Sequence, residues 1–150
     1  MMRDSVFFVF GRNVNLKNQV KLTLMQWGIK CITIDEHGGI GSTIIENLED
    51  LVPKAEFAVV LYSGDDEGRL YEPEKKEEDK KKLEVRAREN VVAELGYVIA
   101  KYGRNNVCIL YEDGVTIPSD FSGVKYISLN DDWKLLLARY LQKSNFTITL

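Results

Sequence analysis

Short apolar runs alternate with segments of helical periodicity along most of the chain, and this alternation limits the possible folds more than any other feature of the sequence. Runs rich in β-branched and aromatic residues are typical of buried strands, whereas apolar residues that recur every three or four positions are typical of helices. Five runs predict strands, at residues 5–10, 31–34, 57–62, 107–111 and 124–129. We therefore expect an α/β fold, a doubly wound parallel sheet of about five strands with helices on both faces and right-handed crossovers.

The segments between these strands predict four helices, at residues 16–27, 44–51, about 90–102 and 133–141. Thr43 and Glu46 have the spacing of a capping box at the start of the second helix. Asn130 or Asp131 is expected to cap the last helix. With 150 residues, 45% of them hydrophobic, the chain can bury one sizeable core, and we expect a single domain over residues 1–150.

A charged tract at residues 67–89 interrupts the alternation. It contains the run Glu-Lys-Lys-Glu-Glu-Asp-Lys-Lys-Lys and is too polar to cover a core. We predict a charged loop or a frayed helix here, and this tract is the one candidate for a mobile lid.

Charge and hydropathy make several function classes unfavourable. The chain has 20 basic and 23 acidic residues, a formal charge of -3, so it has no strong positive field to attract a nucleic acid. No apolar run approaches the roughly 20 residues of a membrane span. The first apolar run is not followed by a small-residue cleavage site, and Cys31 and Cys108 lie inside apolar runs typical of buried thiols. We expect a cytoplasmic protein with neither a nucleic-acid nor a membrane partner.

The topology places the ligand site before any motif is considered. In open parallel sheets, ligands bind outside the carboxyl ends of the strands, near the switch point in strand order. A nucleotide-sized cleft is therefore expected among residues 10–13, 35–43, 63–68 and 112–123. The polar residues concentrated in these segments are Arg12, Asn13, Asp35, Glu36, Ser42, Asp65 and Asp66.

The helix that begins near Asn90 contributes the residue best suited to chemistry. At about 100° per residue its apolar stripe centres on Leu95, and Asn90 and Glu94 share one flank. Arg86 and Arg88 precede them closely, so that a cation and an amide could hold the Glu94 carboxylate or bind a phosphate. The alternative is that Glu94 is an ordinary solvated glutamate.

Three familiar chemistries are disfavoured. His37 is the only histidine, so a histidine-dependent triad or a histidine-rich metal site would depend on that one residue, and we expect no metal site. No P-loop with Lys-Ser/Thr is present, and the sequence after Gly11 is not a dinucleotide fingerprint, although Asp35 follows at a suitable distance. Gly38, Gly39 and Gly41 could cradle a phosphate or be ordinary loop glycines.

Several segments, in this order, carry a resemblance to a known family. They are Phe-Val-Phe-Gly-Arg-Asn at 8–13, Gly-Ser-Thr-Ile-Ile-Glu at 41–46, the strand at 57–61 running into 65–68, Arg-Ala-Arg-Glu-Asn-Val-Val-Ala-Glu-Leu-Gly-Tyr at 86–97, and Pro-Ser-Asp at 118–120 with Gly123. Together they resemble the prokaryotic TIR-like, nucleotide-binding domains that serve as effectors in bacterial antiphage signalling. The chain departs from that pattern at Phe10, where the family often has His, and at Ala93, where it often has an aromatic residue.

The resemblance implies a flavodoxin-like TIR fold and cleavage of the nicotinamide N-glycosidic bond of NAD, with NAD as substrate and no cofactor. It assigns Glu94 as the catalytic glutamate. Because nicotinamide leaves as a neutral molecule, one carboxylate that stabilises an oxocarbenium-like ribose suffices. Arg12 and Arg86 would contact the pyrophosphate, and Phe10 would pack on a ring. The expected substrate-binding residues are Phe10, Gly11, Arg12, Asp35, Ser42, Thr43, Ser63, Asp65, Asp66, Arg86 and Asn90.

Alternatives remain at this stage. Attack by water would give ADP-ribose, whereas attack by the adenine would give a cyclic product. The resemblance also implies a homo-oligomer or a separate activating partner. A nucleoside deoxyribosyltransferase has a similar architecture and also uses a glutamate, and a non-enzymatic receptor for a nucleotide or cyclic nucleotide, or a TIR scaffold, fits the same fold.

Overall fold

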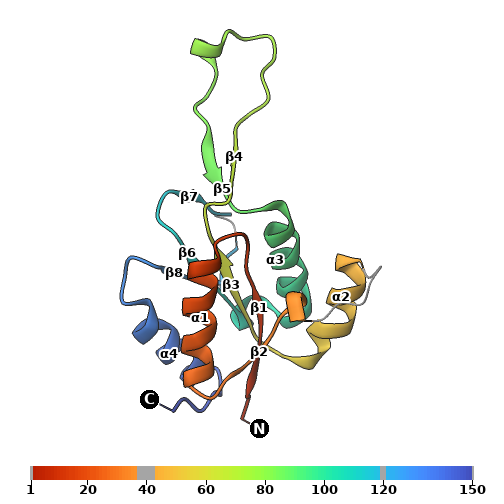
Figure 1. Cartoon of the computed structure of the whole chain (residues 1–150), viewed down its shortest axis with the longest axis vertical. Helices are drawn as coiled ribbons and strands as arrows, with labels where there is room; N and C mark the ends of the chain where they lie inside the picture. Colours follow the sequence, from red (N-terminus) through yellow and green to blue (C-terminus); the bar gives the residue numbers. More distant parts are fainter. Residues whose placement is uncertain (1, 37–42, 119–120, 150) are drawn as a thin grey trace.

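A computed structural model describes residues 2–36, 43–118 and 121–149. Its centre is a five-stranded parallel sheet (Figure 1). The strands are β1 (Ser5–Val9), β2 (Lys30–Ile32), β3 (Ala58–Tyr62), β6 (Val107–Tyr111) and β8 (Lys125–Ser128), in the order β2-β1-β3-β6-β8. The chain moves from β1 to one side, then returns to the other side of β1 with β3, so the strand order reverses between β1 and β3. The predicted fold class is confirmed.

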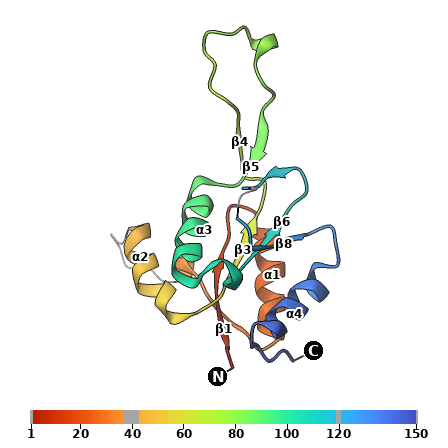
Figure 2. The ribbon, with the colours of Figure 1, turned by 180° about the vertical axis from the view of Figure 1, so that it is seen from behind.

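Two helices cover each face of this sheet, as Figures 1 and 2 show. α1 (Val14–Gln26) and α4 (Trp133–Lys143) lie on one face, and α2 (Ile44–Leu51) and α3 (Glu89–Tyr102) lie on the other. Successive strand residues point to opposite faces. In β3, Val59 and Leu61 therefore join the core under α1 and α4, while Ala58 and Val60 join the core under α2 and α3. Burial on both faces explains why the strand sequences are almost wholly apolar.

Short 3₁₀ helices complete the connections, at Ile34–Glu36, Val52–Lys54, Glu77–Asp79 and Arg104–Asn106. Cys31 and Cys108 are buried, as predicted. Both termini lie at the amino end of the sheet's strands, away from the carboxyl ends that are expected to carry the site (Figure 1).

Helix capping confirms one prediction and corrects another. The Thr43 hydroxyl accepts a hydrogen bond from the backbone N–H of Glu46 at 3.1 Å, and the Glu46 carboxylate accepts one from the backbone N–H of Thr43 at 3.4 Å. This is the predicted capping box, and it fixes where α2 begins.

The predicted cap of α4 is wrong. Asp132, rather than Asn130 or Asp131, accepts a hydrogen bond from the backbone N–H of Leu135, at 3.5 Å. Asn130 is engaged elsewhere, because its amide donates to the Asp113 carboxylate at 2.7 Å. A contact between residues far apart in sequence thus occupies Asn130, and the capping residue lies one or two positions later than predicted.

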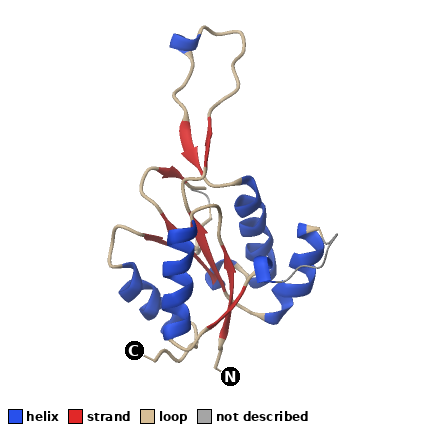
Figure 3. Ribbon diagram, in the orientation of Figure 1, coloured by secondary structure: helices blue, strands red, loops and turns tan. Residues whose placement is uncertain are grey.

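The charged tract folds differently from our expectation. β4 (Asp66–Gly68) and β5 (Glu84–Arg86) pair antiparallel, and β5 pairs parallel with β7 (Val115–Thr116), giving a second sheet of three strands. We call residues 66–86 the arm; it projects away from the helices and the main sheet (Figures 1 and 3). The expected charged loop or frayed helix is therefore wrong at both ends of the tract. Main-chain ladder hydrogen bonds form these strands, and a high density of charged side chains does not prevent such bonds.

Candidate functional site

A small cavity of about 180 Å³ lies at the carboxyl ends of β1 and β2, against α3. It brings together residues from four elements far apart in sequence. Its lining residues are Phe8, Phe10, Gly11, Ile34, Asp35, Ile44, Arg88, Asn90 and Glu94. Five of these are predicted site residues: Phe10, Gly11, Asp35, Asn90 and Glu94. Small-molecule sites usually measure roughly 300–1,000 Å³. The described walls thus enclose space for one ring rather than the whole nucleotide that we expected.

Glu94 is buried in this cavity, with only 9% of the residue exposed. The alternative of a solvated glutamate is therefore wrong. Burial raises its pKa to about 7, and the nearby Arg88 guanidinium only partly opposes that rise. Among the residues that the structure describes, none donates a hydrogen bond to the carboxylate. A carboxylate whose charge is poorly solvated and weakly paired is suited to stabilising a positive charge that develops beside it.

Arg88, rather than Arg86, supplies the cation near Glu94. Arg88 is the N-cap residue of α3 and lines the cavity, as does Asn90 one turn before Glu94. Arg86 lies on β5, where its guanidinium contacts the Glu84 carboxylate at 3.2 Å. The two arginines are neighbours in sequence, but they point to different places because Arg86 still belongs to a strand and Arg88 begins the helix.

Lys17 is a residue of this region that the sequence did not reveal. It lies in the first turn of α1, with its Nζ 2.6 Å from the Asp35 carboxylate and 4.4 Å from the centroid of the Phe10 ring. Burial alone would raise the pKa of Asp35, but the hydrogen bond and charge of Lys17, together with smaller effects of Thr33 and Lys21, outweigh it and hold that pKa below its usual range. Its position just after the carboxyl end of β1 is the signal that could have identified it.

Gly11 and Asp65 are in close contact at the carboxyl ends of β1 and β3. A Cβ atom added to Gly11 would lie 1.8 Å from Asp65 Oδ2, so a larger residue would displace that carboxylate. The Ser63 hydroxyl donates a hydrogen bond to Asp65 Oδ1 at 2.9 Å. Asp65 Oδ2 is buried and has no hydrogen-bond partner among the described residues. Within the described part of the chain, Asp65 Oδ2 is thus a buried acceptor without a partner, directly behind Gly11 of the cavity wall.

A second, larger cavity of about 760 Å³ lies on the other flank of α3, at the base of the arm. Asp66 and Arg86, two of the predicted substrate-binding residues, line this cavity rather than the one at Glu94. The remaining lining residues are Tyr62, Glu67, Gly68, Ala87, Glu89, Val92, Ala93, Thr116, Ile117 and Pro118. Arg12 connects the two regions through an ion pair of 2.9 Å with Asp66. The predicted site residues are thus divided between two cavities that flank one helix.

Some predicted site residues have other positions. Thr43 uses its hydroxyl to cap α2. Ser42, His37, the loop glycines 38, 39 and 41, and Asp120 lie outside the described residues. Within residues 2–36, 43–118 and 121–149, no cluster of three or more His, Cys, Asp or Glu side chains could hold a metal ion. In the same part of the chain, no helix is both long and apolar enough to cross a bilayer.

Comparisons with known proteins show which family the chain resembles. Residues 5–131, which include every predicted site residue, match the family described as "CAP12/Pycsar effector protein, TIR domain". Protein tirC of Dictyostelium discoideum is 33% identical over 141 residues, which is 89% of this chain and 68% of tirC. Protein YuaY of Escherichia coli K12 is 34% identical over 131 residues, 86% of this chain but only 42% of YuaY. The chain therefore spans less than half the length of YuaY.

Proposed function

Because the chain belongs to the CAP12/Pycsar effector TIR-domain family, we propose that it is an NAD glycohydrolase that releases nicotinamide, with Glu94 as its catalytic residue. The observation that carries the proposal is the Glu94 carboxylate, 9% exposed, with its pKa raised to about 7 by burial, in a cavity that can take one ring. That cavity lies at the carboxyl ends of parallel strands, where ligands of such folds bind.

The proposed reaction mainly requires that the protein place a negative charge beside the ribose. The bond between the ribose C1′ and the pyridinium nitrogen breaks, and its electron pair stays on the nitrogen, so nicotinamide departs neutral. The ribose is left as an oxocarbenium-like cation, which the Glu94 carboxylate stabilises. Water then attacks C1′ and loses a proton, which gives ADP-ribose; attack by the adenine of the same molecule would give a cyclic product instead.

The residues around Glu94 have roles that follow from their positions. Phe10 contributes an aromatic wall for the ring. Asn90 lies one helical turn from Glu94 and can donate to a ribose hydroxyl. Lys17, held by Asp35 at 2.6 Å, supplies a second cation besides Arg12 that can contact the pyrophosphate. The cationic pyridinium ring of the substrate would itself lower the pKa of Glu94 and favour the charged form.

The decisive experiment follows nicotinamide release by chromatography after NAD is incubated with the wild type, Glu94→Gln and Glu49→Gln. Glutamine keeps the shape of the side chain and removes its charge, so release is expected to fall at least about 10³-fold. Glu49 is an exposed glutamate of α2 outside the Glu94 cavity, and its variant should match the wild type. The incubation uses a high protein concentration and a crowding agent, so that an assembly required for turnover can form.

Three results would overturn the proposal. No release by the wild type, despite tight NAD binding, would indicate a nucleotide receptor or scaffold. Release that persists in Glu94→Gln would place the chemistry elsewhere. Transfer of deoxyribose from free deoxyribonucleosides to another base, without action on NAD, would indicate a deoxyribosyltransferase. If release does occur, the ratio of linear to cyclic ADP-ribose identifies the nucleophile.

A further inference from the structure

Four large apolar side chains of the arm are exposed. Tyr71 is 86% exposed, more than any other large hydrophobic residue that the structure describes. Leu70, Leu83 and Val85 are between 42% and 56% exposed. Figures 1 and 2 show from opposite sides that the arm stands clear of the helices. Leu70, Tyr71 and Leu83 thus leave much of their apolar surface in solvent, whereas Val85, at the base of the arm, lies against Gly64. Tyrosine and leucine clustered in this way are typical of surfaces that another protein covers.

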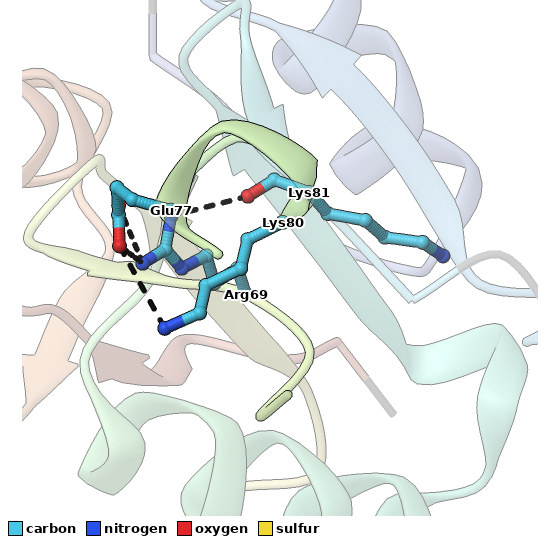
Figure 4. Close-up of polar contacts among 4 residues, drawn as sticks. All are labelled: Arg69, Glu77, Lys80 and Lys81. Atoms are coloured by element: carbon cyan, nitrogen blue, oxygen red, sulfur yellow. Dashed lines mark hydrogen bonds and ion pairs between the residues drawn. The ribbon is translucent and has the colours of Figure 1, made fainter. Parts of the chain in front are cut away.

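Polar contacts among Arg69, Glu77, Lys80 and Lys81, which we call the bracket, hold the arm in shape (Figure 4). The Arg69 guanidinium donates to both carboxylate oxygens of Glu77, at 2.8 and 3.1 Å, and to the backbone carbonyl of Lys81 at 3.3 Å. Lys80 lies 3.7 Å from the same carboxylate. The Glu77 carboxylate thus connects the ascending and descending halves of the arm. A segment ordered before it meets a partner loses less conformational entropy on binding.

The acidic and the basic residues of the arm lie mainly in different halves of it. Residues 66–74, the ascending half, carry four acidic residues and one basic one, whereas residues 80–86, the descending half, carry four basic residues and one acidic one. Over residues 66–86 the totals are eight acidic and seven basic residues, so the arm lacks the single-sign field that would attract a nucleic acid or an anionic membrane. Some of these charges are paired within the chain, such as Asp66 with Arg12 and Glu72 with Lys75. Glu67 and Glu74 in the acidic half, and Lys81 and Lys82 in the basic half, have no ion pair among the described residues, so each arm presents both halves of a complementary pair.

We propose that the arm is a self-association surface, on which the arms of two copies of this chain pack face to face. A twofold axis parallel to the arms places the acidic half of each arm against the basic half of the other, so every attraction occurs twice. The same contact covers Leu70 and Tyr71 of one copy with Leu83 and Val85 of the other. Charge complementarity identifies the partner as a second copy. The contact does not depend on the proposed chemistry.

The test measures dimer dissociation by sedimentation equilibrium at low ionic strength. Lys81→Glu/Lys82→Glu makes both halves of the arm acidic, and Glu67→Lys/Glu74→Lys makes both halves basic. Each double variant alone should dimerise at least about tenfold more weakly than the wild type. An equimolar mixture of the two should associate again, because an acidic arm then faces a basic one. That recovery cannot arise from a variant that has merely lost its fold.

Two further variants complete the experiment. Lys134→Glu/Lys143→Glu changes the net charge by the same amount on α4, away from the arm, and should dimerise like the wild type. Tyr71→Ser should weaken dimerisation about tenfold or more, as expected for a central aromatic side chain. The proposal is overturned if the wild type stays monomeric up to its solubility limit, if both reversal variants dimerise normally, or if their mixture remains monomeric.

Discussion

Glu94 and Glu77 have the same side chain in opposite settings, one in the cavity beside α3 and one in the arm. Glu94 is 9% exposed, and burial raises its pKa to about 7. The Glu77 side chain is 75% exposed, and the hydrogen bonds and charge of Arg69 lower its pKa. The buried carboxylate has only the charge of Arg88 to oppose its burial, whereas the exposed one is held by two hydrogen bonds from one guanidinium.

The contrast separates a chemical role from a structural one. In the cavity, low solvation makes the charge of Glu94 costly, so a cation that develops beside it is strongly favoured. In the arm, water and Arg69 satisfy Glu77, and the carboxylate has no unmet charge to offer a substrate. Carboxyl groups whose environments drive their pKa values apart commonly have such divided roles. Three measurements test this interpretation.

The largest expected effect is on turnover by Glu94→Asp. Aspartate keeps the charge but withdraws the carboxylate from the ribose by one methylene, and a misplacement of that size typically costs about 10²-fold in rate. We expect kcat for nicotinamide release to fall by roughly 10²-fold with little change in KM. A variant that keeps wild-type kcat would show that charge alone matters, and that the cavity does not need to place it. The matched exposed change, Glu49→Asp, should leave kcat unaltered.

The next effect concerns stability and pH. The pKa of Glu94 is about 7 in the folded chain, against an ordinary 4.5, so the folded state holds the proton more tightly than the unfolded state. The free energy of unfolding of the wild type therefore falls as pH rises from 4.5 to about 7 and changes no further from this cause. Glu94→Gln lacks this titration. It should match the wild type near the lower limit and exceed it by about 2–3 kcal/mol above the upper one.

Urea unfolding of both proteins at about pH 5 and about pH 8 measures this difference. Glu49→Gln, an exposed change of the same kind, should show no such dependence on pH. A Glu94→Gln variant less stable than the wild type at the higher pH would contradict the interpretation, because it would mean that the ionised carboxylate has a stabilising partner. In that case the ionised Glu94 carboxylate would not lower the stability of the fold in exchange for activity.

Most of the main sheet and its helices could be predicted from the sequence. Strands that are buried on both faces are almost wholly apolar, and helices that pack on one face have apolar residues every three or four positions. The strands, the capping box at Thr43 and the shared flank of Asn90 and Glu94 all follow from such local geometry. Lys17 could not be identified in this way. Its contacts with Phe10 and Asp35 join segments separated by the chain's crossover, and on α1 alone it looks like any solvated lysine.

The arm escaped prediction for a different reason. Its strands β4 and β5 have three residues each and bury little, so no hydrophobic pattern marks them. Backbone hydrogen bonds, such as that from Asp65 N–H to the Arg86 carbonyl at 3.0 Å, build them instead. The same short strand explains the position of Arg86: the residue ends β5 and lines the larger cavity, while Arg88 lines the cavity at Glu94.

The smallest expected effect is that of Glu77→Gln, and it should be local. The amide cannot accept two charge-assisted hydrogen bonds from Arg69, so the bracket weakens and the arm opens more often. Trypsin cleaves after lysine and arginine and needs an opened segment, and the arm has five lysines between residues 75 and 82. We expect the first cut within the arm to become several-fold faster, on the order of 3- to 10-fold. The midpoint of thermal unfolding should not change, because Glu77 belongs to no core.

Glu78→Gln, one residue along, removes the same charge without touching the bracket and should be cut at the wild-type rate. Equal cutting rates for all three proteins would show that the arm owes its shape to something other than Arg69 and Glu77, and the contrast between the two glutamates would then rest on Glu94 alone.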